Sequence, residues 1–488
     1  MVTVATLLTI CGIVGLFYLE RQPENRTSKT LWVPTIWLLN AGSRNISEWT
    51  NTGPGAFSVD RYLEGNPIDR NFQSAILALA LAVLISRRER IGRILRKNIP
   101  IALFILYCLI SVLWSDFPAV SFKRWTKLAG DFMMVMIIVT EPVPRAAIRQ
   151  ILLRTGCLLV PLSILFIRYY PEWGRHYSRW TGEVSYTGIT MDKNTLGMVC
   201  LIVGVGVVWR ILQAYRDRVE RHKWQRLIAQ GALAGMVVWL LLTANSATSL
   251  SCFVLAGGLM AVLKLSPLAR RPGMVNLLVF VVLAVPFSAM FLDVGTSGLV
   301  EGIGRNSTFT GRTILWEAVL RTAEDPVLGS GYESFWLGER VEKVGAITGQ
   351  HPNEAHNGYL EIYANLGWVG VVLLSIVIVT GYGHALSGFR YDQEMGALRL
   401  AYFVAALAYN FSEAGFKMTH PVWILFLWAT TVVPTSRKTQ MWKASREESH
   451  DADGGLSTSK RGARVGSAYL GGVAPRIITN YYQEGGSR

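Results

Sequence analysis

Residues 351–383 read HPNEAHNGYLEIYANLGWVGVVLLSIVIVTGYG, and this stretch changes from polar to apolar within a short run of chain. Its second half, residues 367–383, contains no charged side chain. An α-helix needs roughly 20 apolar residues to cross the hydrocarbon core of a bilayer. The stretch therefore predicts a membrane helix that is preceded by a polar segment containing a histidine, His356.

Apolar blocks of the same kind recur along the chain. They centre on residues 4–19, 30–42, 72–86, 100–114, 127–140, 150–168, 195–211, 227–243, 247–264, 275–292, 367–383, 399–413 and 420–435. Only helices and closed barrels satisfy backbone polar groups in lipid, and continuous apolar runs are not the alternating pattern of a barrel. We therefore expect an all-α polytopic membrane protein with 12 or 13 transmembrane helices. Whether the first and second spans cross the membrane completely stays open.

Composition agrees with this class. The chain is 51% hydrophobic and 17% charged, against about 25% charged residues in a typical soluble protein. The net charge is +15, but most basic residues lie in short loops beside apolar blocks, so we expect no nucleic-acid partner. All five cysteines fall inside apolar blocks, which predicts neither a disulfide framework nor a metal-binding motif.

Lysine and arginine also predict the orientation, because they are retained in cytoplasmic loops. Basic residues gather near 87–97, 210–226 and 264–271, which we place in the cytoplasm. The spans then place the following segments on the opposite, periplasmic side: 44–71, 115–126, 169–194, 293–366 and 414–419. We expect a transmembrane domain over 1–435, with 293–366 as its large periplasmic loop. Residues 436–488 are rich in Gly, Ser and Arg, and predict a disordered cytoplasmic tail.

Some cations break this rule. The predicted periplasmic segments contain Arg168, Arg175, Arg179, Lys193, Arg305 and Arg312. Basic residues retained on the disfavoured side indicate an anionic ligand, since arginine binds phosphate oxygens with two hydrogen bonds. The alternative, most apt for Arg168 and Arg175, is that the side chains reach lipid phosphates at the interface.

Five short motifs, all on the predicted periplasmic side, resemble those of one family. They are H-N-x9-G-x-x-G (His356, Asn357, Gly367, Gly370), G-R-x3-W (Gly311, Arg312, Trp316), G-x-G (Gly329, Gly331), R…G…K-N-x-L-G (Arg179, Gly188, Lys193, Asn194, Gly197) and W-S-x-x-P…R (Trp114, Ser115, Arg124). In this order, over residues 70–435, they resemble the O-antigen ligase and polysaccharide polymerase superfamily, in particular its exopolysaccharide polymerase branch.

The resemblance implies a fold and a reaction. Members are membrane glycosyltransferases of GT-C-type architecture that work without a metal or other cofactor. They take a glycan from undecaprenyl diphosphate in the periplasm of the bacterial inner membrane. Arg179 and Arg312 are expected to hold the diphosphate, and His356 to act on the acceptor hydroxyl. Binding partners are the lipid-linked donor, a glycan acceptor and membrane lipid, with a chain-length regulator and a flippase as further candidates.

The residue types suit that chemistry. Fixed guanidinium groups stabilise charge that develops on a leaving phosphate, and a histidine with an ordinary pKa near 6.5 can take a hydroxyl proton. The alternative for His356 is a helix-capping role. As further substrate-binding residues we predict Asn357, Lys193, Asn194, Tyr359, Glu361 and Arg305. Asn357 or Glu361 would orient His356, and Tyr359 would stack on a sugar. Gly367 and Gly370 are expected one turn apart on one helix face, open to close packing.

Three functions remain in competition. The K-N-x-L-G segment favours a polymerase that extends lipid-linked exopolysaccharide or O-antigen repeats. A ligase that joins glycan to the lipid A core uses the same chemistry. A transporter of an anionic glycolipid is a non-enzymatic alternative, but transporters place ionisable groups within spans and show repeated halves. The sugar, the linkage, the chain length and the oligomeric state stay open.

Overall fold

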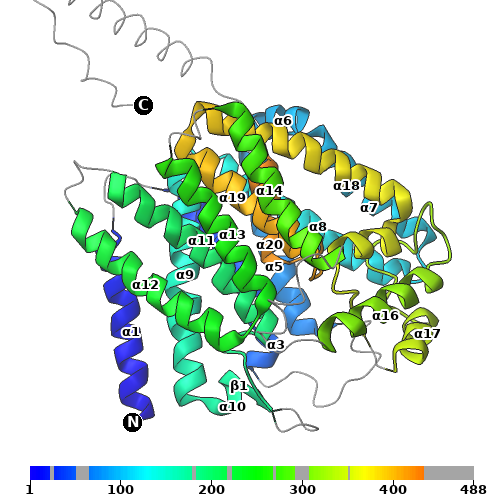
Figure 1. The fold of residues 1–488 in the computed structure, drawn as a ribbon, viewed down its shortest axis with the longest axis horizontal. Coiled ribbons are helices and arrows are strands. Elements are labelled where there is room, and N and C mark those ends of the chain that lie inside the picture. The colour runs from blue at the N-terminus through cyan, green and yellow to red at the C-terminus, as the bar shows by residue number, and fades with distance from the viewer. Residues whose placement is uncertain are drawn as a thin grey trace, which may run out of the picture. The chain divides into compact units, whose positions relative to one another are not determined.

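The computed structural model describes residues 1–21, 27–50, 65–177, 183–216, 222–266, 271–291, 307–349 and 352–433. Helices dominate these residues (Figure 1). They are α1 (Val2–Leu19), η1 (Lys29–Leu31), α2 (Trp32–Ala41), α3 (Ile46–Trp49), α5 (Pro67–Ser86), α6 (Arg88–Lys97), α7 (Ile99–Ile110), η2 (Ser111–Trp114), α8 (Pro118–Val139), α9 (Pro144–Tyr169), α10 (Pro171–Gly174), α11 (Lys193–Arg216), α12 (Lys223–Ala244), α13 (Ala247–Leu265), α14 (Pro272–Phe291), α16 (Ser307–Thr322), α17 (Glu339–Thr348), α18 (Gly358–Tyr391), α19 (Gln393–Tyr409) and α20 (Pro421–Thr430).

The all-α polytopic class is confirmed. Among the described residues, seven helices are long and apolar enough to cross a membrane, or eight if α6 and the α7–η2 helix, bent by 93°, form one span. The other expected spans are helical too, but they are short, like α2 and α20, or charged, like α8 with Lys123, Arg124, Lys127 and Asp131. The count of 12 or 13 spans therefore stays a prediction, as does the expected tail, which lies outside the described residues.

The only strands among the described residues form a small hairpin. β1 (Arg175–Tyr177) pairs antiparallel with β2 (Val184–Tyr186), with Arg175 opposite Tyr186. Apolar periodicity did not predict it, because the segment is polar and short.

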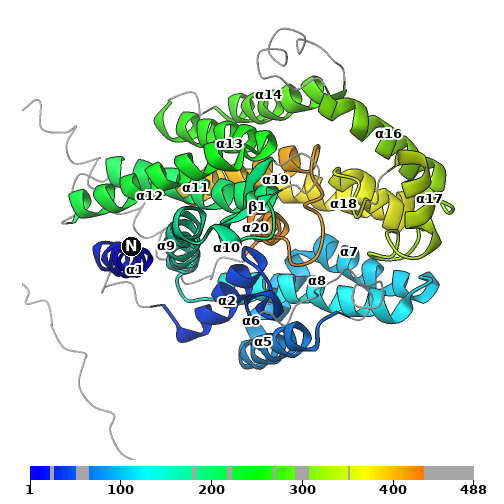
Figure 2. The same ribbon diagram turned by 90° about the horizontal axis from the view of Figure 1, so that it is seen from below.

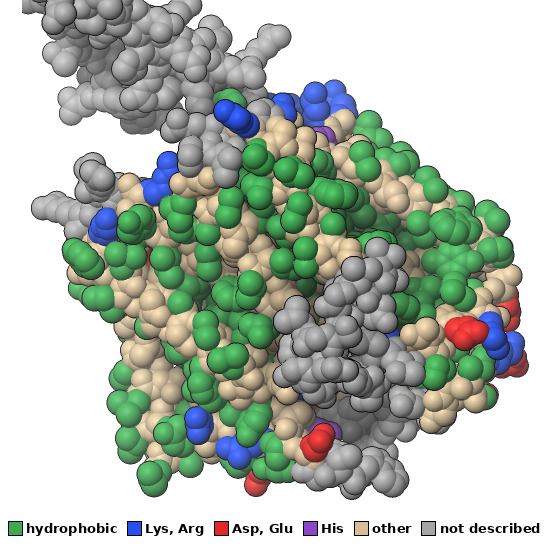
Figure 3. All heavy atoms as spheres, viewed as in Figure 1, with side chains coloured by type: hydrophobic (Ala, Val, Ile, Leu, Met, Phe, Trp, Pro, Cys, Tyr) green, Lys and Arg blue, Asp and Glu red, His purple; other side chains and the backbone are tan. Residues whose placement is uncertain are grey.

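The segments expected on opposite sides of the membrane lie at opposite ends of the described fold. α3, α10, α16 and α17 lie in the lower part of Figure 1, whereas the basic helix α6 lies at the top. Figure 3 shows a group of Lys and Arg side chains at this top edge and a wide hydrophobic surface below it. Charged side chains are also visible at the lower edge of Figure 3, so the apolar surface lies between two charged ends, and which end faces the periplasm stays a prediction.

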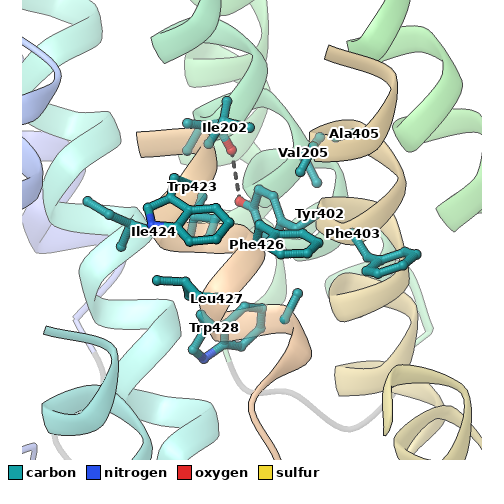
Figure 4. Close-up of a cluster of buried hydrophobic side chains, with 14 of the residues drawn as sticks. Ile202, Val205, Tyr402, Phe403, Ala405, Trp423, Ile424, Phe426, Leu427 and Trp428 are labelled. Carbon is teal, nitrogen blue, oxygen red and sulfur yellow. Dashed lines mark hydrogen bonds between the residues drawn. The ribbon is translucent and has the colours of Figure 1, made fainter. Parts of the chain in front are cut away.

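The core centres on α20, which contacts α8, α11, α18 and α19 (Figure 2). Every residue of α20 is buried, so this helix is apolar on all sides. Trp423 and Phe426 stack within the core, and the Tyr402 hydroxyl donates a hydrogen bond of 2.8 Å to the carbonyl of Ile202 (Figure 4). The tight packing of α19 and α20 fixes the connection between them, residues 410–420.

α18 is not one continuous helix. Gly367 has φ +61° and ψ −164°, which breaks the helix at the first glycine of G-x-x-G. The amides of Trp368 and Val369 bond instead to the carbonyls of Pro326 and Val327. The predicted shared helix face of Gly367 and Gly370 is therefore wrong: Gly367 is needed for a turn that receives the 326–329 segment.

Candidate active site

Three segments distant in sequence bring charged side chains together. α16 carries Arg312, the turn before α18 carries Glu354 and His356, and the α19–α20 connection carries Glu413 and Lys417. Arg312, Glu413 and His356 form a continuous series, because Nη2 of Arg312 lies 3.3 Å from Oε1 of Glu413 and Nδ1 of His356 lies 3.3 Å from Oε2. One carboxylate thus links two of the predicted catalytic residues.

α16 explains the spacing of the G-R-x3-W motif. Arg312 and Trp316 are four residues apart and therefore share a helix face. While Arg312 reaches Glu413, the indole N–H of Trp316 donates a hydrogen bond of 2.8 Å to the carbonyl of Ala355, the residue before His356. The motif positions both the guanidinium and the turn that presents the histidine.

His356 is held between two acidic side chains. Its Nδ1 lies 3.0 Å from Oε1 of Glu354 as well as 3.3 Å from Glu413. The hydrogen bond with Glu354, followed by that with Glu413, raises the pKa of His356 to about 9 although burial opposes the shift. The backbone of His356 is left-handed, with φ +48°, a conformation that costs a non-glycine residue free energy and clusters at functional sites. With Nδ1 occupied, Nε2 is the nitrogen left for a substrate.

Lys417 completes the cluster from the other side of Glu354. Its ammonium lies 2.5 Å from Oε2 of Glu354. Burial favours the neutral forms of both groups, but their attraction prevails: the pKa of Glu354 lies well below its usual range and the pKa of Lys417 above it. The cluster is therefore charged rather than neutralised by proton transfer.

The 410–420 connection is itself fixed to the start of α18. The side-chain carbonyl of Asn410 accepts hydrogen bonds from the amides of Gly415 and Phe416, and its backbone carbonyl accepts one of 2.9 Å from the amide of Gly358. Glu413 and His356 are thus presented by two segments that share one anchor.

Two further motifs pack together beside this cluster. The Ser115 and Ser334 hydroxyls lie 2.8 Å apart, and Ser121 donates a hydrogen bond of 2.7 Å to the carbonyl of Tyr332. Gly331 has φ +91°, and a Cβ there would meet that of Ser115 at 2.7 Å. The W-S-x-x-P loop and the G-x-G turn therefore form one rigid unit.

Comparison with known proteins finds two similarities. Residues 232–375 match the family model described as O-antigen ligase. The "Exopolysaccharide production protein ExoQ" of Rhizobium meliloti (strain 1021) is 26% identical over 313 residues, which cover 62% of this chain and 68% of that protein. Over these residues the chain is similar to O-antigen ligases and to an exopolysaccharide production protein. The resemblance seen in the motifs is confirmed.

The matched O-antigen ligase region contains Arg312, Glu354 and His356, whereas Glu413 and Lys417 lie beyond its end. Three charged partners in this cluster, Glu354, Glu413 and Lys417, were not predicted from the sequence. Their signal was present: FSEAGFKMTH places an acid and a base between two apolar blocks on the predicted periplasmic side. Glu354 stands two residues before His356. Which of these charged side chains pair with each other depends on how the helices pack.

Asn357 and Glu361 act on the backbone around His356 rather than on its ring. Asn357 Oδ1 caps α18 by accepting from the amides of Tyr359 and Leu360. Glu361 accepts from the amide of Ala355 and from the indole of Trp336. In the described bonds, the groups that orient the imidazole are therefore Glu354 and Glu413, in place of the predicted Asn357 or Glu361.

Tyr359 is held by the fold. Its hydroxyl donates a hydrogen bond of 3.1 Å to the carbonyl of Leu407, and its ring packs against Phe411 and Phe416. Its predicted stacking on a sugar therefore competes with internal packing.

The remaining predicted residues lie elsewhere or outside the described residues. Lys193 is exposed and Asn194 half-buried at the start of α11, and their substrate-binding role stays a prediction. Asp192 caps this helix at the amides of Asn194 and Thr195. Arg179 and Arg305 lie outside the described residues, so the expected convergence of Arg179 with Arg312 stays a prediction.

The cluster also has the donor set of a metal site. Glu354, His356 and Glu413 each offer one ligand atom, and these atoms lie within 4.8 Å of one another. However, Lys417 already pairs with Glu354 and Arg312 with Glu413. A divalent cation would have to compete with both pairs. The arrangement therefore favours a ligand anion that replaces Glu413 at Arg312 over a bound metal ion.

Proposed function

We propose that this protein is a membrane glycosyltransferase that transfers a glycan from undecaprenyl diphosphate to a sugar hydroxyl on the periplasmic side, polymerising exopolysaccharide or O-antigen repeats. The observation that carries the proposal is the Arg312–Glu413–His356 series. It holds a phosphate-binding group and a proton acceptor next to each other at one end of the helical fold.

Arg312 is the group for the leaving diphosphate. Its 3.3 Å contact with Glu413 is longer than a strong charge-assisted bond of about 2.7–2.9 Å, and its side chain is 23% exposed. A diphosphate offers more negative charge and a better match to the guanidinium fork than this single carboxylate oxygen. Donor binding therefore draws Arg312 from Glu413 to the phosphate, where it stabilises the charge of the leaving group.

His356 is the group for the acceptor. As the acceptor oxygen bonds to the anomeric carbon, the bond from that carbon to the diphosphate oxygen breaks and the hydroxyl proton passes to Nε2. Glu354 and Glu413 hold Nδ1 and stabilise the imidazolium that forms. The leaving group is undecaprenyl diphosphate, in which the diphosphate stays attached to its lipid. The protein needs no nucleotide sugar. With Arg312 and Lys417 supplying positive charge, we expect no metal requirement.

The comparisons are compatible with two kinds of glycan acceptor. Similarity to an exopolysaccharide production protein supports polymerisation, and the O-antigen ligase description of residues 232–375 supports transfer to a lipid A core sugar. A deletion strain separates them. Single repeats that remain attached indicate a lost polymerase, whereas polymer left on its carrier indicates a lost ligase.

Purified protein mixed with an undecaprenyl-diphosphate-linked oligosaccharide and an acceptor glycan tests the proposal. We expect release of undecaprenyl diphosphate together with a longer glycan, unchanged by EDTA, and no product from His356→Ala at normal folding. Binding of the donor without turnover by the native protein would favour a transporter. Loss of activity in EDTA with recovery on adding Mg²⁺ or Mn²⁺ would overturn the metal-independent mechanism.

A further inference from the structure

A cavity of about 210 Å³ lies beside the charged cluster but is separate from it. Its walls come from the end of η2, the 323–330 turn, the residues before α17, and α17 itself. At roughly 30 Å³ per water it has room for about seven waters, which suits one sugar ring. Nothing in the proposed transfer step uses it.

The walls of the cavity are preformed. Arg340 of α17 is paired with Asp116 at 2.5 Å, and Asn365 Oδ1 accepts hydrogen bonds from the amides of Ser334 and Phe335. Gly329, with φ +73°, lies directly against the backbone of residues 365–367. A site with such fixed walls loses little conformational entropy when a ligand binds.

The lining combines the groups that a polyhydroxylated ring needs. Trp114 and Phe335 offer apolar ring surface. The indole nitrogen of Trp114 and Nε of Arg340 have no hydrogen-bond partner among the described residues, but both atoms are closed off from solvent, so the ring surfaces and the carboxylates are what a ligand meets. Asp116, Glu324 and Asp325 supply carboxylate acceptors, although Asp325 also caps the amides of Val327 and Leu328.

The charge of the lining restricts the class of ligand that the cavity can bind. Asp116 pairs with Arg340 and Glu324 with Lys343, which leaves the carboxylate of Asp325 in excess, so the cavity does not favour phosphates or carboxylates. It therefore suits a neutral sugar or an amino sugar, and the diphosphate belongs at Arg312 instead.

A series of three side chains, Phe335, Trp336 and Glu361, connects the cavity to the charged cluster around His356. Phe335 lines the cavity and packs edge-to-face on Trp336, at 5.1 Å between ring centroids. The Trp336 indole donates to Glu361 at 2.9 Å, and Glu361 holds the amide of Ala355 next to His356. From this geometry we infer that the cavity binds one neutral or amino-sugar unit of the glycan, at a distance from the reacting bond. The inference rests on the proposed glycan transfer.

Binding of a lipid-free oligosaccharide tests this subsite apart from catalysis. The probe is the oligosaccharide pool from partial acid hydrolysis of the polysaccharide that the host strain makes, added to full-length protein in detergent. We expect saturable binding that Trp114→Phe and Asp116→Asn each weaken about tenfold, since the first reduces the aromatic surface and the second removes a carboxylate charge. In transfer assays, both variants should raise the KM for glycan and leave kcat nearly unchanged.

Two controls keep the result specific. Glu342→Gln changes an exposed carboxylate of α17 outside the lining and should bind as the native protein does. His356→Ala should bind the oligosaccharide normally while transferring none. Thermal unfolding shows whether Trp114→Phe folds, and Asp116→Asn provides a second variant that alters no volume.

Three results would overturn the subsite: no binding to the native protein, binding by both cavity variants as tight as that of the native protein, or displacement of the oligosaccharide by inorganic pyrophosphate. Failure of the proposed function gives a different result, namely normal oligosaccharide binding without any transfer.

Discussion

At the scale of the residue, the central feature is one carboxylate shared by a guanidinium and an imidazole. Glu413 contacts Arg312 with one oxygen and His356 with the other. The same side chain therefore helps to position Arg312 and, together with Glu354, raises the basicity of His356.

The first prediction concerns pH. Because Glu354 and Glu413 raise the pKa of His356 to about 9, only about one imidazole in a hundred is neutral at pH 7. If neutral His356 accepts the proton, kcat/KM rises with pH up to about 9. Glu413→Gln removes one stabilising charge and should move this rise to lower pH, besides lowering the maximum.

The control for the pH experiment is Glu317→Gln, an exposed carboxylate of α16 paired with Arg321. It should leave the profile unchanged. A rate that falls as pH rises through 9 would show that His356 acts in its protonated form.

The second prediction concerns the shape of the cation. Arg312→Lys keeps the charge but loses the planar fork, so we expect kcat/KM to fall at least about tenfold, roughly one lost charge-assisted bond. Arg321→Lys, an exposed position on the same helix, should be neutral. Near-normal transfer by Arg312→Lys would mean that a point charge suffices.

At the scale of the element, the sequence predicted more about the helices than about the turns between them. Apolar blocks located the long helices, whereas the shared helix face of Arg312 and Trp316 is a finding of the structure. The break at Gly367 was not predicted, because the residues around it read as one apolar helix and the cause lies in the 326–329 segment. Glu413 was missed for a similar reason, since its partners come from other elements.

The third prediction tests that break. Gly367→Ala places a side chain at φ +61° and into the backbone of Val327, so it should destabilise the protein by about 1–3 kcal/mol or more. Gly383→Ala, also in α18, meets no atom within 4 Å and should be harmless. Thermal unfolding in detergent measures both, and equal midpoints would contradict the account of the kink.

At the scale of the whole molecule, the charge distribution agrees with the two ends that the sequence predicts. Basic segments such as α6 lie opposite the end that carries α16 and α17 (Figure 1). The all-α class follows from the continuous apolar runs of the sequence. The number of full spans does not, since α8 carries charges and α19 and α20 are short.

The fourth prediction assigns the ends to compartments. In a cysteine-free background, Lys343→Cys on α17 should react with a membrane-impermeant maleimide in intact spheroplasts, because we place that end in the periplasm. Arg93→Cys on α6 should react only after lysis. Both positions are exposed, so accessibility in the fold is matched. The reverse pattern would put the charged cluster in the cytoplasm.

The most direct measurement is a cryo-EM structure of the protein with undecaprenyl diphosphate bound. We expect the diphosphate within about 3 Å of the Arg312 guanidinium, with Glu413 released to His356 and the lipid entering from the apolar belt. A headgroup bound at the opposite end, near Arg210, or with the Arg312–Glu413 pair left intact, would contradict it.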